Sequence, residues 1–546
     1  MHFKRNRSLF SLFFIVLVLG AVGYVFYRYN CAINILRKEH FLLQKSLTNQ
    51  LSDQKKEILQ AKITQSSSVT TSEKTWLDIQ KKVKDTVVQI FADVTEFNWI
   101  EPYKTPKQGA SRGSGFFVNQ EGDIITNYHV VCEAVSVQIQ IPSLGLERFD
   151  AEVIGASPDR DIALLRLTEK DFERVKKKLG QLPFLSFGDS DRVVRSQEVL
   201  ALGYPLGQSR LKSTLGIVSG RERLGYFGYI QVSTPLNPGN SGGPALNTAG
   251  EVIGINSRGI PSAQNVGYII PINEVRSALE DLNKVALLRK PTLGCIFTWA
   301  TPEMVNYLGN PEEGGWYVAK VFDNTLLRDV GLKDGDMMYE VNGYRIDMYG
   351  EMDVPWSEDK VSLFEFLNRY KVGDDLDFLI YRHGEPKEFH FKLENNYLPP
   401  IRTIYPEFEK DETDYEVFGG MVLMNLTLNH VAMMLSSSPD LIKYGRLEKQ
   451  HEHALILTHV LPNSQAFKAR VLRPGTVVEQ INGKKVKTLE DFRQIILESK
   501  KSGYVTIKTD DELYAVLSLE KILQDEEVLP KLYFYDRSKL VETLSK

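Results

Sequence analysis

A serine in this chain has the surroundings that acyl-transfer chemistry needs. Ser241 lies in the glycine-rich segment Asn237-Pro238-Gly239-Asn240-Ser241-Gly242-Gly243-Pro244, ahead of a short apolar run. A serine hydroxyl becomes an effective nucleophile only when a neighbouring base takes its proton. Glycine permits the backbone dihedrals that turn amides toward an oxyanion, so the amides of Gly239 and Ser241 are the expected donors. The backbone of Gly239, Asn240 and Ser241 forms the predicted oxyanion hole, and a plain β-turn is the alternative interpretation.

A base and a carboxylate complete the pattern. His129, in the segment Thr126-Asn127-Tyr128-His129-Val130-Val131, is the only histidine between Trp76 and Leu287. A single histidine is usually structural, but together with the serine turn it is the predicted general base. Asp161 directly precedes the apolar run Ile162-Ala163-Leu164-Leu165 and is the predicted carboxylate that orients the imidazole. Asp159 is the alternative for this role. The chain order His, Asp, Ser is that of the chymotrypsin-type arrangement.

The segments around these residues predict a β-rich domain. From residue 76 to residue 287, short runs rich in Val, Ile and Phe alternate with Gly, Asn, Asp and Pro. Many short strands separated by turns are typical of an all-β barrel or sandwich. Residues 273–288 then predict one amphipathic helix that closes the domain.

An internal repeat follows this domain. Gly331-Leu332-Lys333-Asp334-Gly335-Asp336 leads to Val341-Asn342-Gly343, and Val471-Leu472-Arg473-Pro474-Gly475-Thr476 leads to Ile481-Asn482-Gly483. The recurrence predicts two copies of one domain type, and each Asn-Gly pair predicts a tight turn. Pro399-Pro400 marks the boundary between the copies.

The N-terminal region predicts export. Ser8 to Tyr27 is an uncharged, mostly apolar run behind Lys4, Arg5 and Arg7. Such a run spans about 30 Å as a helix, so we expect a membrane anchor with the rest of the chain on the far side. Cleavage of a signal peptide near Ala21-Val22-Gly23 is the alternative. Residues 31–63 predict a juxtamembrane coiled coil or an exposed stalk helix, and residues 64–73 predict a linker.

Composition excludes several other classes of protein. The net charge is −4, so no overall basic field points to nucleic acid as a partner. Three scattered cysteines form no disulfide framework and have no metal-ligand spacing. His451-Glu452-His453 lacks further ligands at site-forming spacing, so we predict no metal and no organic cofactor.

Taken together, these segments resemble the HtrA (Deg) family of serine proteases. Leu202-Gly203-Tyr204-Pro205-Leu206-Gly207 and Gly216-Ile217-Val218-Ser219 match the family as well, and the resemblance covers residues 75–525. It implies a mainly β chain in which a trypsin-like double β-barrel carries the triad His129, Asp161 and Ser241. It also implies that the two repeats are PDZ domains. The carboxylate-binding loop of the first would then be Leu293, Gly294, Cys295 and Ile296, and that of the second Phe418 to Val422.

The expected domain organisation follows from these assignments. It comprises a cytoplasmic tip and transmembrane anchor (1–30), a helical stalk and linker (31–74), the protease (75–288), PDZ domain 1 (289–397), PDZ domain 2 (398–530) and a C-terminal tail (531–546). An insertion at residues 345–359 is expected to alter the peptide groove of the first PDZ domain.

Specificity and partners are predicted more coarsely. Asn265 to Pro271 aligns with the family's primary specificity pocket and contains no acid, so we expect cleavage after small or medium aliphatic residues. The resemblance implies a homotrimer or a multiple of it that acts on unfolded exported polypeptides and binds peptide C-termini. We predict a single-pass inner-membrane protein with a periplasmic catalytic domain, or a soluble periplasmic one if the N-terminus is cleaved. A protease-fold chaperone and a PDZ scaffold without catalysis are the alternative functions.

Overall fold

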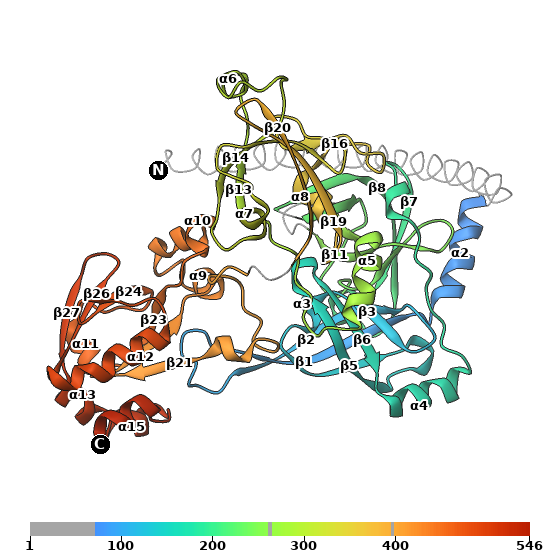
Figure 1. The fold of residues 1–546 in the computed structure, drawn as a ribbon. Helices are drawn as coiled ribbons and strands as arrows, with labels where there is room; N and C mark the ends of the chain where they lie inside the picture. The colour runs from blue at the N-terminus through green and yellow to red at the C-terminus, as the bar shows by residue number, and fades with distance from the viewer. Residues whose placement is uncertain (1–70, 226, 260–264, 395–397) are drawn as a thin grey trace, which may run out of the picture. The chain divides into compact units, whose positions relative to one another are not determined.

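Two closed β-barrels follow one another in this chain (Figure 1). They are seen in a computed structural model that describes residues 71–225, 227–259, 265–394 and 398–546. Residues from Ile79 onward form one compact unit. In the first barrel the strand order is β1 (Val87–Glu96), β2 (Lys107–Phe117), β3 (Asp123–Thr126), β6 (Ile162–Leu167), β5 (Arg148–Ser157) and β4 (Ala134–Gln140). In the second it is β10 (Pro244–Leu246), β11 (Val252–Gly259), β12 (Gly267–Pro271), β9 (Phe227–Val232), β8 (Lys212–Leu224) and β7 (Glu198–Gly203).

Each barrel is filled by the apolar residues of its own strands. In the first barrel Ile90, Phe117, Ile139 and Phe149 are fully buried, which explains the short Val-, Ile- and Phe-rich runs in the sequence. Each strand is too short to bury its apolar side alone, and closure of the sheet removes both exposed edges. The predicted trypsin-like double barrel is therefore confirmed.

The helices around the barrels are short. They are α3 (Tyr128–Val131), α4 (Glu169–Leu179) and α5 (Ile272–Leu282). The prediction of one helix over residues 273–288 was too long. Beyond Leu282 the chain pairs with β5 instead, because the Ala156 amide donates to Ala286 at 2.9 Å and the Leu288 amide donates to Ala156 at 2.8 Å.

Helix α2 (Thr71–Val83) begins inside the segment expected to be a linker. Ile79 and Val83 are buried, and their spacing of four residues is the helical signal that the Ser/Thr-rich stretch before them obscured. The apolar run at residues 8–27 and the expected stalk up to residue 70 lie outside the described residues. Within the described part of the chain, no helix has the length and apolarity needed to cross a membrane.

The two repeats are antiparallel sheets with similar strand orders. The first has the order β13 (Cys295–Thr298), β14 (Trp316–Val321), β15 (Met337–Val341), β19 (Asp375–Arg382) and β20 (Glu385–Lys392), with β16 (Tyr344–Arg345) beside β15. The second has the order β21 (Tyr415–Phe418), β22 (Met421–Asn425), β23 (Leu455–Val460), β24 (Thr476–Ile481), β26 (Tyr504–Thr509) and β27 (Tyr514–Ser518), with β25 (Lys484–Lys485) beside β24. The predicted insertion contains β17 (Glu351–Met352), which pairs with β18 (Val361–Ser362).

The repeated Asn-Gly pairs occupy the same position in both sheets. Asn342-Gly343 joins β15 to β16, and Asn482-Gly483 joins β24 to β25. All four residues have positive φ: 46° and 77° in the first pair, 52° and 74° in the second. These dihedrals are those of a two-residue hairpin turn, so the predicted tight turns are confirmed.

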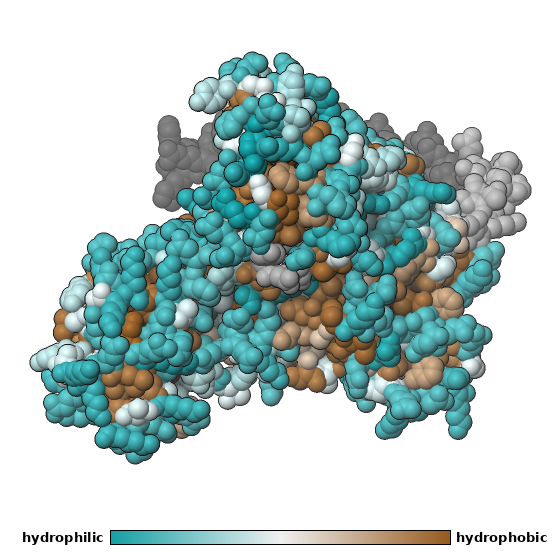
Figure 2. Space-filling view, viewed as in Figure 1, coloured by the Kyte–Doolittle hydropathy of each residue, from teal (hydrophilic) through white to brown (hydrophobic). Residues whose placement is uncertain are grey.

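Short helices cover the two sheets. In the first repeat they are α6 (Pro302–Tyr307), α7 (Leu326–Val330) and α8 (Leu363–Leu367). In the second they are α9 (Leu428–Met434), α10 (Leu447–Gln450), α11 (Gln465–Ala469), α12 (Leu489–Glu498), α13 (Leu519–Asp525), α14 (Leu529–Tyr533) and α15 (Lys539–Ser545). Residues 531–546, expected as a tail, include α15, whose Leu540, Val541 and Leu544 are buried in the core of the second repeat. The face seen in Figure 2 is mainly hydrophilic, with hydrophobic side chains exposed in scattered patches.

Candidate active site

His129 and Asp161 meet at the mouth of the first barrel. His129 lies in α3, directly after β3, and Asp161 lies between a 3₁₀ turn (Pro158–Arg160) and β6. The Nδ1 atom of His129 lies 2.9 Å from Oδ2 and 3.0 Å from Oδ1 of Asp161, and its backbone amide donates to Oδ1 at 3.0 Å. A carboxylate so placed accepts the Nδ1 proton and leaves Nε2 as the basic nitrogen.

Asp161 is held in a conformation that few residues adopt. Its φ and ψ are 54° and 44°, in the left-handed region, which Asp tolerates better than most side chains. Asn127 stabilises this turn because its side-chain amide donates to the Asp161 carbonyl at 2.9 Å. The side chain of Asp161 is 12% exposed, whereas that of His129 is 49% exposed. The carboxylate is therefore shielded while the imidazole faces solvent.

The turn around Ser241 depends on its glycines. Gly239 and Gly242 have φ of 98° and 85°. A Cβ on Gly242 would lie 2.1 Å from the Ser114 carbonyl oxygen, and one on Gly239 would lie 2.3 Å from the Tyr204 carbonyl oxygen. The amide of Asn240, which the prediction included in the oxyanion hole, donates to the Asn237 carbonyl at 3.0 Å within the turn.

Ser257 in β11 connects Ser241 to the His129–Asp161 pair. The Ser241 hydroxyl donates to the Ser257 carbonyl at 2.9 Å, and the Ser257 hydroxyl donates to Oδ2 of Asp161 at 3.2 Å. The structure therefore brings the three predicted residues into one hydrogen-bonded group, with the Ser241 hydroxyl directed to Ser257. Ser257 was not predicted from the sequence, although the buried polar pair Asn256-Ser257 at the end of an apolar strand was an available signal.

The alternative carboxylate, Asp159, has other partners. Its Oδ2 accepts from the Lys290 amide at 3.1 Å, and its Oδ1 accepts from the Tyr405 hydroxyl at 3.3 Å. Of the two acidic residues, Asp161 is thus the one that contacts the imidazole. The nearby thiol of Cys132 is no rival nucleophile, because burial raises its pKa to about 12 and keeps it protonated at neutral pH.

The predicted carboxylate-binding loop of the first repeat lines a cavity. Leu293, Gly294 and Cys295 border a space of about 390 Å³ together with Phe364 and Leu367 of α8. Gly294 has φ of 68°, and a Cβ there would lie 2.3 Å from the Thr325 side chain. Ile296 continues into β13, opposite Lys320 of β14.

Two further segments considered in the sequence have defined places in the fold. Phe418 and Met421, from the loop predicted for the second repeat, are partners at the closed end of the β21–β22 hairpin. The ring of His451, in the segment His451-Glu452-His453, stacks on Phe322 with centroids 3.9 Å apart.

Comparisons with known proteins agree with this arrangement. A trypsin-like peptidase domain model matches residues 113–255, and a PDZ domain model matches residues 405–534. A probable periplasmic serine endoprotease, DegP-like, of Marinomonas is 26% identical over 428 residues, which cover 77% of this chain and 81% of the relative. A protein of the same description from Bartonella henselae is 28% identical over 413 residues, which cover 73% of each chain.

Solved structures are also similar in part. The HtrA-type protease AlgW with a decapeptide is 23% identical with a TM-score of 0.46, and the match covers 59% of this chain and 99% of that one. The peptidase and PDZ matches define a serine endopeptidase with PDZ domains. Together these matches support an HtrA (Deg) family serine protease with a PDZ domain.

Proposed function

We propose that this protein degrades unfolded or misfolded exported polypeptides through an acyl-enzyme formed on Ser241. The observation that carries the proposal is the pair of contacts between Nδ1 of His129 and both carboxylate oxygens of Asp161, at 3.0 Å and 2.9 Å. That contact fixes the tautomer in which Nε2 accepts the serine proton.

The first half of the reaction forms the acyl-enzyme. The Ser241 hydroxyl rotates away from the Ser257 carbonyl, gives its proton to Nε2 of His129 and attacks the carbonyl carbon of the scissile bond. The amides of Gly239 and Ser241 donate to the oxyanion that develops. Asp161 stabilises the imidazolium, which then protonates the leaving amine as the carbon–nitrogen bond breaks.

The second half releases the acyl product. Water takes the place of the amine, His129 accepts its proton, and the hydroxide attacks the ester carbonyl. The ester bond breaks, the serine oxygen recovers a proton from the imidazolium, and the product leaves as a carboxylic acid. Each proton that His129 accepts is returned within the same half-reaction, so the enzyme is regenerated without any cofactor.

Degradation of an unfolded model substrate tests this proposal. Wild-type protein and Ser241→Ala are incubated with reduced, carboxymethylated casein, and cleavage is followed by mass spectrometry. Loss of cleavage in the variant, with peptide binding retained, supports catalysis by Ser241. Equal cleavage by both proteins refutes it, and absence of cleavage by both favours a chaperone or scaffold.

The same cleavage products test specificity. Strand β12 and the residues before it carry no acid that would pair with a basic substrate side chain, so the residue on the amino side of the cut is expected to be Val, Ala or Leu. A map dominated by cuts after Lys or Arg contradicts this expectation.

Location and assembly form the remaining part of the proposal. The relatives named above are described as periplasmic, and the run at residues 8–27 has the length and apolarity of an anchor, so we infer a periplasmic catalytic domain on an inner-membrane anchor. We infer a homotrimer or a multiple of it from the family resemblance. Carbonate extraction of membranes and light scattering of the detergent-solubilised protein test the two inferences separately.

A further inference from the structure

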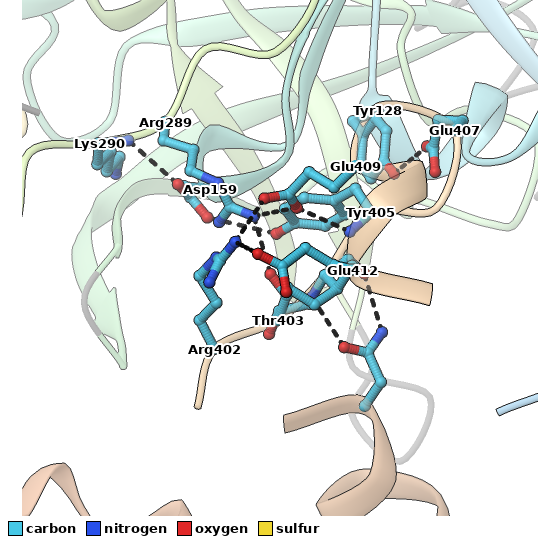
Figure 3. Close-up of polar contacts among 12 residues, drawn as sticks. Tyr128, Asp159, Arg289, Lys290, Arg402, Thr403, Tyr405, Glu407, Glu409 and Glu412 are labelled. Atoms are coloured by element: carbon cyan, nitrogen blue, oxygen red, sulfur yellow. Dashed lines mark hydrogen bonds and ion pairs between the residues drawn. The ribbon is translucent and has the colours of Figure 1, made fainter. Parts of the chain in front are cut away.

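The segment that leads into the first strand of the second repeat crosses to the protease domain beside the catalytic residues. We call residues 398–413 the strap; it precedes β21 and includes a short 3₁₀ helix, Lys410–Thr413. Figure 3 shows the side chains of Tyr405 and Glu407 directed toward Asp159 and Tyr128 of the first barrel. From the sequence, this stretch was expected to begin the second PDZ domain, with Pro399-Pro400 marking the boundary before it. Its contacts give it a second role.

The first contact involves the helix that carries His129. The Tyr128 hydroxyl donates to Oε1 of Glu407 at 2.5 Å, and the backbone amide of Glu133 donates to the same oxygen at 3.2 Å. Tyr128 precedes the catalytic histidine, and Glu133 follows the end of α3. One carboxylate oxygen of Glu407 therefore accepts a hydrogen bond from each end of this helical segment.

The second contact involves the turn that carries Asp161. The Tyr405 hydroxyl donates to Oδ1 of Asp159, whose other oxygen accepts from the Lys290 amide. Asp159 belongs to the 3₁₀ turn that ends at the left-handed Asp161, and the Asp161 amide donates back to Pro158 at 3.0 Å. Rotation of this turn would move the Asp161 carboxylate away from the imidazole.

A single aromatic ring links the two contacts. The Tyr405 ring packs edge-to-face against the Tyr128 ring, with centroids 5.6 Å apart and an interplanar angle of 84°. Burial raises the pKa of Tyr128 and that of Tyr405, so both hydroxyls stay protonated and act as donors. The guanidinium of Arg289 lies 4.9 Å from the centroid of the Tyr405 ring and covers it.

The strap is itself held rigidly. Arg289 donates to the Thr403 carbonyl at 2.9 Å and pairs with the Glu409 carboxylate at 2.5 Å. Glu409 also accepts from the Tyr405 amide at 3.1 Å and from Arg402 at 3.1 Å. Arg289 and Arg402 are both largely buried, so these ion pairs are screened little by water. A rigid support can hold catalytic groups in place, which a flexible one cannot.

We propose that Tyr405 and Glu407 are positioning residues for peptide-bond hydrolysis. They act through Asp159 and Tyr128 to keep the Asp161 carboxylate aligned with Nδ1 of His129. The proposal rests on the proposed roles of His129, Asp161 and Ser241. It adds that alignment is supplied by a segment outside the protease domain, so the catalytic pair is complete only when the strap is docked.

Matched substitutions in the full chain distinguish an effect on the alignment of Asp161 with His129 from an effect on the stability of the fold. Tyr405→Phe keeps the ring and loses the hydroxyl, and Glu407→Ala loses the acceptor that Glu407→Gln retains. Glu412→Gln is the control, because Glu412 pairs with Arg402 at 2.8 Å inside the strap and its side chain is 41% exposed. Each variant is measured with a short chromogenic peptide, with a fluorophosphonate that labels Ser241, and by thermal unfolding.

The expected result is a loss of kcat at constant KM. Tyr405→Phe and Glu407→Ala should lower kcat and the fluorophosphonate rate about 3- to 10-fold, the effect of one lost hydrogen bond. Glu407→Gln should recover most of the loss, and Glu412→Gln should stay within about 2-fold of wild type. Wild-type labelling rates in Tyr405→Phe and Glu407→Ala, even with lowered unfolding temperatures, overturn the proposal. Absence of labelling at Ser241 in the wild type instead overturns the proposed function.

Discussion

Replacement of Asp161 by asparagine removes charge without removing volume. The carboxylate accepts three donors: the His129 amide at Oδ1, Nδ1 of His129 at both oxygens, and the Ser257 hydroxyl at Oδ2. An asparagine amide must put its NH₂ group at one of these two positions. The position of Oδ1 is disfavoured because a backbone N–H, which cannot reverse its direction, faces it.

The NH₂ group is therefore expected at the position of Oδ2. There the Ser257 hydroxyl can rotate to accept, but Nδ1 of His129 lies 2.9 Å away and must accept as well. The imidazole then carries its proton on Nε2 and cannot take the proton of Ser241. A wrong tautomer of this kind lowers kcat about 10³- to 10⁴-fold in catalytic triads, equivalent to about 4–5.5 kcal/mol of transition-state stabilisation.

The matched control is Asp159→Asn. The carboxylate of Asp159 accepts from one backbone amide and from one hydroxyl. An asparagine can keep both hydrogen bonds because the hydroxyl can reverse its direction, so kcat should fall less than about 3-fold. Both variants are assayed with a chromogenic peptide under saturating conditions, with circular dichroism as the test of folding. A folded Asp161→Asn protein that keeps more than a tenth of the wild-type kcat would refute the assignment. So would an Asp159→Asn protein with the larger defect.

Three further predictions concern the same unit. Ser257→Ala keeps the carbonyl but loses the donor to Asp161, so kcat/KM should fall about 5- to 30-fold; an unchanged value argues against that contact. Gly242→Ala brings a Cβ within 2.1 Å of a carbonyl oxygen at φ of 85°, so both activity and unfolding temperature should drop. In Gly145→Ala, where φ and ψ are 70° and −130° and the space around a Cβ is open, only the backbone strain of about 1–3 kcal/mol should appear. Burial lowers the pKa of His430 from 6.5 to about 3. Between these pH values the unfolded chain binds a proton that the folded chain excludes, so stability should fall by up to about 1.4 kcal/mol per pH unit on acidification. Urea unfolding at several pH values from 7 to 4 gives the free energy of unfolding at each pH. This free energy should change less with pH in His430→Gln than in the wild type, and an identical pH dependence would count against this account.

The sequence by itself determined the local features of this protein. Short apolar runs between turn residues identify barrel strands, because each strand buries its residues within a few positions. Asn-Gly pairs identify hairpins, because few other pairs adopt two positive φ values. The glycines around Ser241 are local in the same way, since their dihedrals and close backbone contacts exclude a Cβ.

Only the tertiary structure decided which groups meet across the chain. Ser257 lies 96 residues from Asp161, and Tyr405 lies 246 residues from Asp159, yet each pair is hydrogen-bonded. Such contacts leave no periodic pattern in the sequence, because the residues adjacent to each partner in the chain carry no information about the distant one. The choice of Asp161 over Asp159 has the same origin. Both carboxylates belong to one short turn. The left-handed backbone of Asp161 sets the direction of its side chain, and the hydrogen bond from Tyr405 of the strap holds the side chain of Asp159.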